Sequence, residues 1–169
     1  MTPFPRADTL PARWRLDPRE GKAFVRAFTV PRSPDDVSDF FADAGHLEHI
    51  APRWLSLHYI SPRDTPIVPD ATLDYRVRIG GVPFSWRTRI VDVQPGRSLA
   101  YEQEVGPCAV WRHLYDYLPV DDGTQIVDSV LWSMPLGWAG RAGRRALGDV
   151  IVQRMFDVRE RRLRELLAP

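Results

Sequence analysis

The sequence has few of the residues that most often identify a chemical activity. Among its 169 residues there is one cysteine, Cys108, which excludes an internal disulfide and any zinc or iron–sulfur site built from several cysteines. The sequence also lacks the G-x-G-x-x-G and P-loop strings that bind nucleotide phosphates. We therefore expect neither a metal site nor a cofactor.

Long apolar segments and a strong charge imbalance are absent as well. No apolar run approaches the roughly 18 residues that span a bilayer, and residues 1–21 lack the apolar core of a secretory signal. Lysine and arginine total 23 against 22 acidic residues, a formal net charge of +1, which does not favour nucleic acid or an anionic membrane as a partner. These absences predict a cytoplasmic, bacterial-type protein with no nucleic-acid partner and no stable membrane insertion.

The chain does contain enough apolar material for one folded domain. Hydrophobic residues make up 44% and charged residues 27% of the sequence, which is typical of a globular domain. Residues 1–22 contain several prolines and scattered charges, so we expect an extended arm with Phe4 or Trp14 as its anchor. Residues 23–169 are expected to form a single domain.

The first part of that domain predicts a strand followed by two short helices. Residues 23–30 have the composition and spacing of a strand. Ser33 is the expected N-cap of a helix, with Pro34 in its first turn. A second short helix is expected over residues 46–51, ending before Pro52.

The middle of the chain predicts a meander of antiparallel strands. A strand is expected at 55–60, and two more at 71–79 and 82–93, which are separated by the hairpin signal Gly80-Gly81. Turn residues divide the next stretch, as far as about residue 133, into three further strands.

The end of the chain changes to a helical period. We expect a long amphipathic helix over roughly 140–166. Its expected apolar face is Leu147, Ile151, Met155, Val158, Leu163 and Leu166. This order of elements predicts an α+β fold.

The sizes of these elements predict a curved sheet. Seven strands about 4.8 Å apart make a sheet roughly 30 Å wide, whereas one helix is about 10–12 Å across. We therefore expect a curved seven-stranded antiparallel sheet wrapped around a long C-terminal helix, with two short helices between strands one and two. The gap between sheet and helix must be filled by large side chains or left as a cavity.

One stretch of the meander carries amphipathic rings at every second position. In GPCAVWRHLYDYLP, residues 106–119, the rings belong to Trp111, His113, Tyr115 and Tyr117, and a strand places alternate residues on one face. Closing each hairpin at its turn residues gives a trial register. In its first row, the cross-strand pairs are Tyr75–Trp86, Trp86–Gln103, Gln103–Trp111 and Trp111–Trp132. In its second row, the residues that lie opposite one another in turn are Leu73, Thr88, Tyr101, His113 and Val130. Beyond these rows, Tyr115 lies opposite Asp128.

This register separates the side chains into an inward and an outward face. The outward face is charged, as expected beside water: Asp74, Arg76, Arg78, Arg87, Arg89, Glu102, Glu104, Arg112 and Asp116. A dry core would penalise the inward Gln103, His113 and Asp128, so we predict a ligand-sized cavity, with a plain packed aromatic core as the alternative. The expected ligand-binding residues are Tyr75, Phe84, Trp86, Tyr101, Gln103, Trp111, His113, Tyr115, Tyr117, Asp128, Trp132 and Met155.

Four segments carry a family resemblance: FFADAGHLEHIAPRWLSL, GGVPFSWRTRI, GPCAVWRHLYDYLP and GTQIVDSVLWSMPLG. Over residues 23–167 the chain resembles the START/Bet v1-like (SRPBCC) superfamily, nearest to its bacterial polyketide cyclase/dehydrase-related group. The resemblance implies the helix-grip fold. Because that superfamily includes lipid and sterol carriers, receptors and cyclases, the resemblance implies no shared set of catalytic residues.

His113 and Asp128 are the inward titratable pair, and three interpretations remain open for them. They are candidate general acid/base residues for a cyclisation, dehydration or aldol-type step. We favour instead a structural or ligand-orienting role, in which they orient a ligand or satisfy each other as a buried pair.

Other candidate groups favour structural interpretations. His46 and His49 lie three residues apart without nearby carboxylate or cysteine ligands, so a solvated surface is expected. Cys108 has no evident activating base. The arginines of the terminal helix, Arg159 among them, alternate with acidic residues and are expected on a wet face. Residues 133–143, which include Trp138, are either a flexible lip of the cavity or a simple turn.

The sequence thus leaves three functions open. We favour binding or carriage of a small hydrophobic or aromatic metabolite between the sheet and the C-terminal helix, because no nucleophile, metal set or cofactor loop is evident. The first alternative is a cofactor-independent cyclase or dehydratase that uses the His113–Asp128 pair. The second is a protein-interaction module with a packed cavity. A homodimer is also open.

Overall fold

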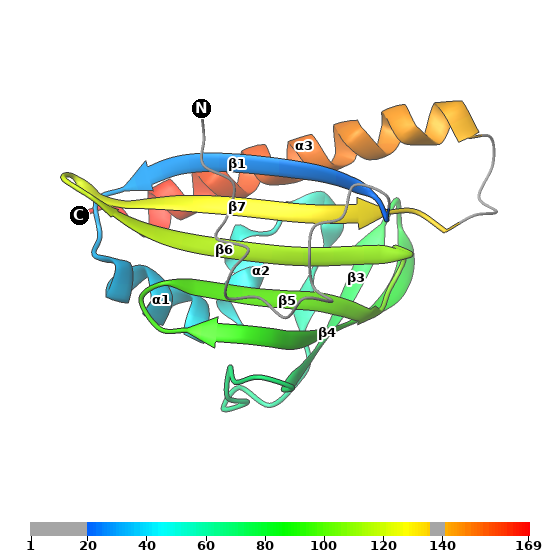
Figure 1. The fold of residues 1–169 in the computed structure, drawn as a ribbon. Helices are drawn as coiled ribbons and strands as arrows, with labels where there is room; N and C mark the ends of the chain where they lie inside the picture. The colour runs from blue at the N-terminus through cyan, green and yellow to red at the C-terminus, as the bar shows by residue number, and fades with distance from the viewer. Residues whose placement is uncertain (1–19, 136–140) are drawn as a thin grey trace.

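Residues 20–135 and 141–169, which the computed structural model describes, form one antiparallel sheet with helices on one of its faces (Figure 1). The strands lie in the order β1-β7-β6-β5-β4-β3-β2. The elements are β1 (Lys22–Val30), α1 (Pro34–Ala42), α2 (His46–Ile50), η2 (Arg53–Leu55), β2 (His58–Tyr59), β3 (Thr72–Ile79), β4 (Val82–Gln94), β5 (Ser98–Val105), β6 (Val110–Val120), β7 (Gly123–Ser133) and α3 (Arg141–Leu166). The predicted α+β helix-grip architecture is confirmed, with the two short helices α1 and α2 between β1 and β2.

Local hydrogen bonds fix the start of α1 where the sequence predicts it. The hydroxyl of Ser33 accepts a hydrogen bond from the backbone N–H of Asp36 at 3.2 Å, and the Asp36 carboxylate accepts one from the backbone N–H of Ser33 at 3.2 Å. This capping box, with Pro34 in the first turn, satisfies donors that a helix start leaves free. Val37 and Phe41 are the buried residues of α1.

The pairing of β6 with both of its neighbours follows the predicted register. The observed pairs include Tyr101–His113, Trp111–Trp132, His113–Val130 and Tyr115–Asp128. In the β3–β4 pair, Tyr75 lies opposite Trp86, also as predicted.

Between β4 and β5 the predicted register is wrong by two residues. The observed pairs are Thr88–Gln103 and Ile90–Tyr101, in place of Trp86–Gln103 and Thr88–Tyr101. The hairpin needs three turn residues between Gln94 and Ser98, with Gly96 at φ +66°, and irregularities lie between Arg87 and Thr88 and between Ile90 and Asp92. Because the displacement is even, each side chain keeps its predicted face.

The predicted strand over 55–60 is mostly not a strand. Residues Arg53–Leu55 form a 3-10 turn that ends at Ser56, which has a left-handed φ of 41°. Only His58–Tyr59 pair with β3. His58 is exposed, in agreement with its predicted outward direction.

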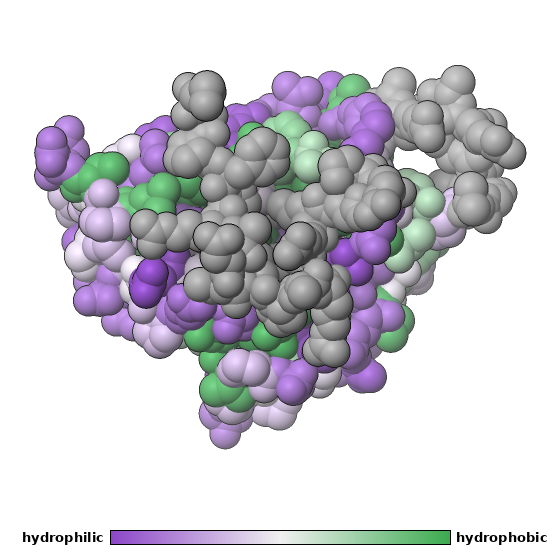
Figure 2. All heavy atoms as spheres, viewed as in Figure 1, coloured by the Kyte–Doolittle hydropathy of each residue, from purple (hydrophilic) through white to green (hydrophobic). Residues whose placement is uncertain are grey.

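The outward face of the sheet is charged, as predicted. Arg87 pairs with Asp74 at 2.7 Å, and Arg89 contacts Glu102 and, at 3.3 Å, Glu104. Figure 2 shows polar residues dominating the described part of this face, with small apolar patches between them. Charges in this position keep one face of the sheet in water while the other face carries the core.

Ion pairs hold α3 against the edge strand β1. Arg26 of β1 contacts Asp157 at 2.6 Å and Glu160 at 2.9 Å. Arg164 donates to the backbone carbonyl of Thr29 at 2.7 Å. The helix therefore covers a strand edge that would otherwise be open to pairing.

The buried face of α3 is rotated from the predicted one. Its buried residues are Val152, Met155, Phe156, Arg159, Leu163 and, just after the helix, Leu167. Leu166 is 48% exposed and Val158 only half-buried, so both are wrong as core residues. The side chain of Leu147 lies outside the described residues.

Two sequence predictions fall on residues that the structure does not describe. The arm of residues 1–22 is described only from residue 20, so the anchoring roles of Phe4 and Trp14 lie outside it. Residues 136–140 of the expected lip, which include Trp138, also lie outside the described residues. Within the described part of the chain, no helix is long and apolar enough to cross a membrane.

Candidate functional site

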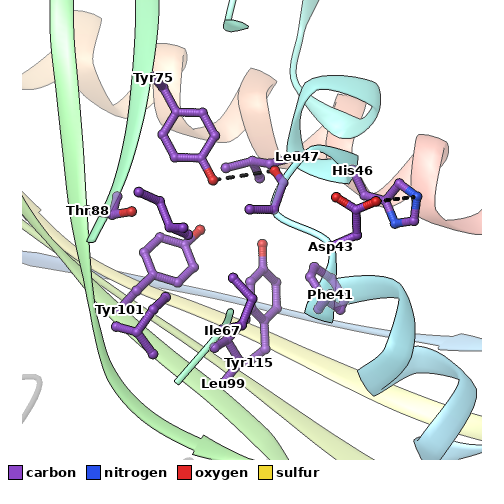
Figure 3. Close-up of a pocket in the computed structure, with 13 residues that line it drawn as sticks. Phe41, Asp43, His46, Leu47, Ile67, Tyr75, Thr88, Leu99, Tyr101 and Tyr115 are labelled. Carbon is purple, nitrogen blue, oxygen red and sulfur yellow. Dashed lines mark hydrogen bonds and ion pairs between the residues drawn. The ribbon is translucent and has the colours of Figure 1, made fainter. Parts of the chain in front are cut away.

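A pocket lies between the sheet and the turn that joins α1 to α2 (Figure 3). Its walls come from α1, α2, the loop before β3 and strands β3 to β6. The lining residues are Phe41, Asp43, Ala44, His46, Leu47, Ile67, Leu73, Tyr75, Thr88, Ile90, Leu99, Tyr101 and Tyr115.

The place and size of this pocket differ from the prediction. Its volume is about 30 Å³, room for water rather than for an organic ligand, whose sites measure roughly 300–1,000 Å³. Beneath the described part of α3, Trp111 and Trp132 belong to one buried cluster with Met155 and Phe156. The pocket lies away from α3, and the predicted cavity between the sheet and the C-terminal helix stays a prediction.

Tyrosines are three of the six polar side chains that line the pocket. Tyr75 donates a long hydrogen bond of 3.4 Å to the carbonyl oxygen of Ala44. Tyr115 packs on Phe41 with ring centroids 4.4 Å apart, and its buried hydroxyl has no hydrogen-bond partner among the described residues. Figure 3 shows the Tyr115 hydroxyl pointing into the pocket between the sheet and Leu47.

Tyr101 connects the pocket to a buried polar cluster. Its hydroxyl lies 3.1 Å from Nδ1 of His113, and Nε2 of the same imidazole is hydrogen-bonded to Oδ1 of Asp128. His113 is 0% and Asp128 1% exposed. Neither residue lines the pocket, so Tyr101 stands between them and any ligand.

Arg159 of α3 completes this cluster. It is 5% exposed, and its Nη1 lies 3.2 Å from Nε2 of His113 and 3.7 Å from Oδ2 of Asp128. The interpretation of Arg159 as a wet-face residue is therefore wrong. Arg159 comes seven residues after Val152 and four before Leu163, so it lies on the buried face of the helix. This spacing is the sequence signal that indicates its burial.

Burial sets the ionisation of the cluster. It disfavours the charged imidazole and, despite the attraction of Asp128, lowers the pKa of His113. It raises the pKa of the Tyr101 phenol to about 12 against the opposing pull of Arg159. Burial also opposes the charge of Arg159, but Tyr115 and Asp128 beside it raise the pKa of the guanidinium. At neutral pH the cluster therefore holds a cation, a neutral imidazole and neutral phenols.

The structure divides the predicted ligand-binding residues into groups. Tyr75, Tyr101 and Tyr115 line the pocket, and His113 and Asp128 lie directly behind it. Tyr117 packs on Phe41, with ring centroids 5.7 Å apart, outside the pocket lining. Trp111, Trp132 and Met155 belong to the second core cluster. Phe84 is partly buried against that cluster, and Trp86 packs against both clusters.

Gln103 has a structural contact of its own. Its Nε2 donates to the backbone carbonyl of Cys108 at 2.7 Å, which braces the turn between β5 and β6. The β5–β6 ladder ends at Glu102–Arg112, so the predicted pairing of Gln103 with Trp111 falls beyond it.

His46 lines the pocket, and its Nε2 lies 3.6 Å from Oδ2 of Asp43, so the expectation of no nearby carboxylate is wrong for His46. His46 stacks on Phe40, and its Nδ1 lies 2.8 Å from the Phe40 carbonyl oxygen. Burial raises the pKa of the Cys108 thiol to about 12, which disfavours the nucleophilic thiolate. Among the described residues, no group of three or more His, Cys, Asp or Glu side chains is placed to hold a metal ion.

Comparison with known proteins agrees with this architecture. The sequence pattern of the family described as "Polyketide cyclase / dehydrase and lipid transport" matches residues 22–167. No functionally curated protein matches the chain.

Solved structures share the fold at low sequence identity. The ZhuI aromatase/cyclase from Streptomyces sp. R1128 is 17% identical with a TM-score of 0.70, over 86% of this chain and 93% of its own. The di-domain ARO/CYC StfQ from the steffimycin biosynthetic pathway is 16% identical with a TM-score of 0.68, over 88% of this chain and 51% of its own. The protein TTHA0849 from Thermus thermophilus is 14% identical with a TM-score of 0.68, over 85% of this chain and 95% of its own.

At these identities the structures show the fold alone, whereas the family pattern covers most of the sequence. The chain belongs to the polyketide cyclase/dehydrase and lipid transport family.

Proposed function

We propose that this protein binds a small, uncharged, largely aromatic molecule with a carbonyl or hydroxyl oxygen, in the pocket beneath the α1–α2 turn. The observation that carries the proposal is the set of three phenols on an otherwise mostly apolar wall. Tyr75, Tyr101 and Tyr115 come from three different strands and meet at this pocket. Apolar pockets with a few convergent polar groups are typical of small-molecule sites.

The charges around the pocket favour an uncharged ligand. The described lining contains no lysine or arginine, and Asp43 lies on it. The nearest buried cation, Arg159, is within 3.7 Å of the Asp128 carboxylate. A ligand carboxylate would therefore lose its water without gaining a free cation, which is costly.

Binding requires the pocket to enlarge from about 30 Å³. The outer wall is suited to this, because it consists of the short α1–α2 turn and the loop that carries Ile67. Val68, next to Ile67, is 47% exposed, so this wall has water on its far side. Outward movement of Ile67 and Leu47 enlarges the pocket without disturbing the sheet.

The matched pair Ile67→Trp and Val68→Trp tests the proposal. Neutral compounds such as naphthol and β-tetralone should bind to the parent protein in isothermal titration calorimetry, while the naphthoate anion should bind at least tenfold more weakly. Ile67→Trp fills the pocket and should abolish binding. Val68→Trp adds the same bulk at an exposed neighbour and should preserve it. Equal binding by both variants, or preferred binding of the anion, contradicts the proposal.

The other functions receive less support from the geometry. Direct acid/base catalysis by His113 and Asp128 is disfavoured, because both lie behind Tyr101. The small volume of the pocket favours the packed interaction module as the second candidate, and that module predicts no binding to any compound in the titration. The cytoplasmic location and the homodimer stay predictions.

A further inference from the structure

The cluster behind the pocket is a continuous chain of hydrogen bonds from the pocket wall to a fully buried carboxylate. We infer that Tyr101, His113 and Asp128 form a proton relay, and that Tyr101 is the catalytic residue that exchanges a proton with a carbonyl compound in the pocket. This inference rests on the proposed binding function. It assigns a reactive role to a phenol, with His113 and Asp128 as the groups that act through it.

The hydrogen bonds assign the direction of the relay. A carboxylate only accepts hydrogen bonds, so we assign the imidazole proton to Nε2, which contacts Asp128 Oδ1, although Arg159 Nη1 also lies 3.2 Å from Nε2. Nδ1 is then an acceptor, and the Tyr101 hydroxyl at 3.1 Å is its donor. A hydroxyl, an imidazole and a buried carboxylate in this order are the arrangement that activates a hydroxyl for proton transfer.

Burial leaves one route for the proton. His113 is 0% exposed and does not line the pocket, whereas Tyr101 does. Among the described residues that line the pocket, Tyr101 is the one hydrogen-bonded to the imidazole, so we route the proton of a ligand through its oxygen. The same burial excludes bulk water from the imidazole.

The charges of the cluster suit a transient tyrosinate. The guanidinium of Arg159 opposes the burial that raises the pKa of the Tyr101 phenol to about 12. An imidazolium formed at His113 would be stabilised by its contact with Asp128, against the burial and the nearby Arg159 that lower the pKa of His113. The tyrosinate and the imidazolium thus form together, with Arg159 beside the first and Asp128 beside the second.

A base of this kind suits a C–H bond next to a carbonyl group. The Tyr101 oxygen takes the proton from that carbon while its own proton passes to Nδ1 of His113. The C–H electron pair becomes the C=C bond of an enolate, and the carbonyl pair moves to oxygen. The reverse transfer returns a proton to carbon, so nothing is oxidised or reduced and no co-reactant is needed.

The enolate oxygen has a donor available in the same pocket. The Tyr115 hydroxyl is buried, lacks a partner among the described residues and points into the pocket (Figure 3). A hydrogen bond from Tyr115 to that oxygen would strengthen as charge develops on it. The pocket therefore holds both groups that enolisation requires.

Deuterium exchange at the activated carbon of β-tetralone tests the relay. Proton NMR in D₂O should show exchange accelerated by the parent protein. Tyr101→Phe keeps the ring but removes the hydroxyl, and should lower the bound exchange rate by about 10²–10⁴-fold, with the dissociation constant changed less than tenfold. Tyr117→Phe also removes a buried hydroxyl, on the strand that carries His113. It should leave the exchange rate and the dissociation constant unchanged. Exchange by Tyr101→Phe at the parent rate, or no acceleration by a parent that binds β-tetralone, overturns the inference.

Nitrogen-15 NMR of His113 tests the relay without any ligand. The expected spectrum has a protonated Nε2 and an unprotonated, hydrogen-bonded Nδ1, whose chemical shift moves in Tyr101→Phe. A proton on Nδ1 would overturn the inference whatever the outcome with ligands. Failure of the parent to bind β-tetralone, with the expected spectrum present, would count against the proposed function and not against the relay.

Discussion

The guanidinium of Arg159 contacts both nitrogens of the His113 imidazole. Its Nη1 lies 3.2 Å from Nε2 and 3.5 Å from Nδ1. Because Asp128 lies beside both residues, this contact joins α3 to β6 and β7 through a buried charge cluster.

Loss of the Arg159 charge is expected to be strongly destabilising. Arg159→Met keeps an apolar stem but leaves the Asp128 carboxylate buried without its cation, and should reduce the free energy of unfolding by about 3–5 kcal/mol. The control Arg161→Met removes a charge that is 62% exposed and lies 3.8 Å from Glu165, and should cost less than about 0.5 kcal/mol. Urea unfolding measures both.

A double-mutant cycle separates the charge pair from simple packing. Arg159→Met combined with Asp128→Asn removes both charges, so the loss should be smaller than the sum of the single losses. Additive losses would mean that the two side chains do not interact.

Stability is expected to fall in alkali. Burial raises the pKa of the Tyr101 phenol to about 12 and that of Tyr117 well above its usual value, so the folded state keeps protons that the unfolded state loses above about pH 10. The stabilisation is complete below pH 10 and is lost as the pH rises. Each such tyrosine contributes at most about 1.4 kcal/mol per pH unit.

Urea titrations between pH 8 and pH 11 measure this slope, and Tyr117→Phe should make it shallower. A stability that stays constant across this range would show that the tyrosines ionise as freely in the folded protein as in the unfolded one.

Gly148 is expected to be required for the close packing of α3 on β7. A Cβ at this position would lie 2.4 Å from Cη2 and 2.8 Å from Cζ3 of Trp132, whose ring is held in the core. Gly148→Ala should therefore destabilise by about 1–3 kcal/mol, although alanine is the better helix former by about 1 kcal/mol. On a Trp132→Phe background the same change should be neutral or stabilising. A thermal-unfolding midpoint that rises in the single variant would contradict this packing.

The faces of the sheet could be predicted from the sequence because a strand has a period of two. Alternation alone placed Tyr101, His113 and Tyr115 inward and Arg87 outward, and the structure agrees. The β4–β5 register could not be predicted, because turn length and strand irregularities near Ile90 leave no clear mark in the hydrophobic pattern. Because the register is displaced by two residues, each side chain keeps its face of the sheet but lies opposite a different residue.

The position of the pocket needed information that alternation does not carry. An inward ring packs in the core or lines a pocket according to the element that lies opposite it. Trp111 and Trp132 share a buried cluster with Phe156 of α3, whereas Tyr101 and Tyr115 face the short α1–α2 turn. Arg159 was missed for a different reason. A charged side chain predicts exposure, whereas the spacing of Arg159 from Val152 and Leu163 is that of a buried residue.

The location of a bound ligand tests the central claim most directly. With methyl-labelled protein and β-tetralone, intermolecular nuclear Overhauser effects should connect the ligand to the methyl groups of Leu47, Ile67 and Ile90, which line the pocket beneath the α1–α2 turn. Contacts to Val152 and Met155 beneath α3, or to exposed methyl groups such as those of Val120 alone, would contradict the account.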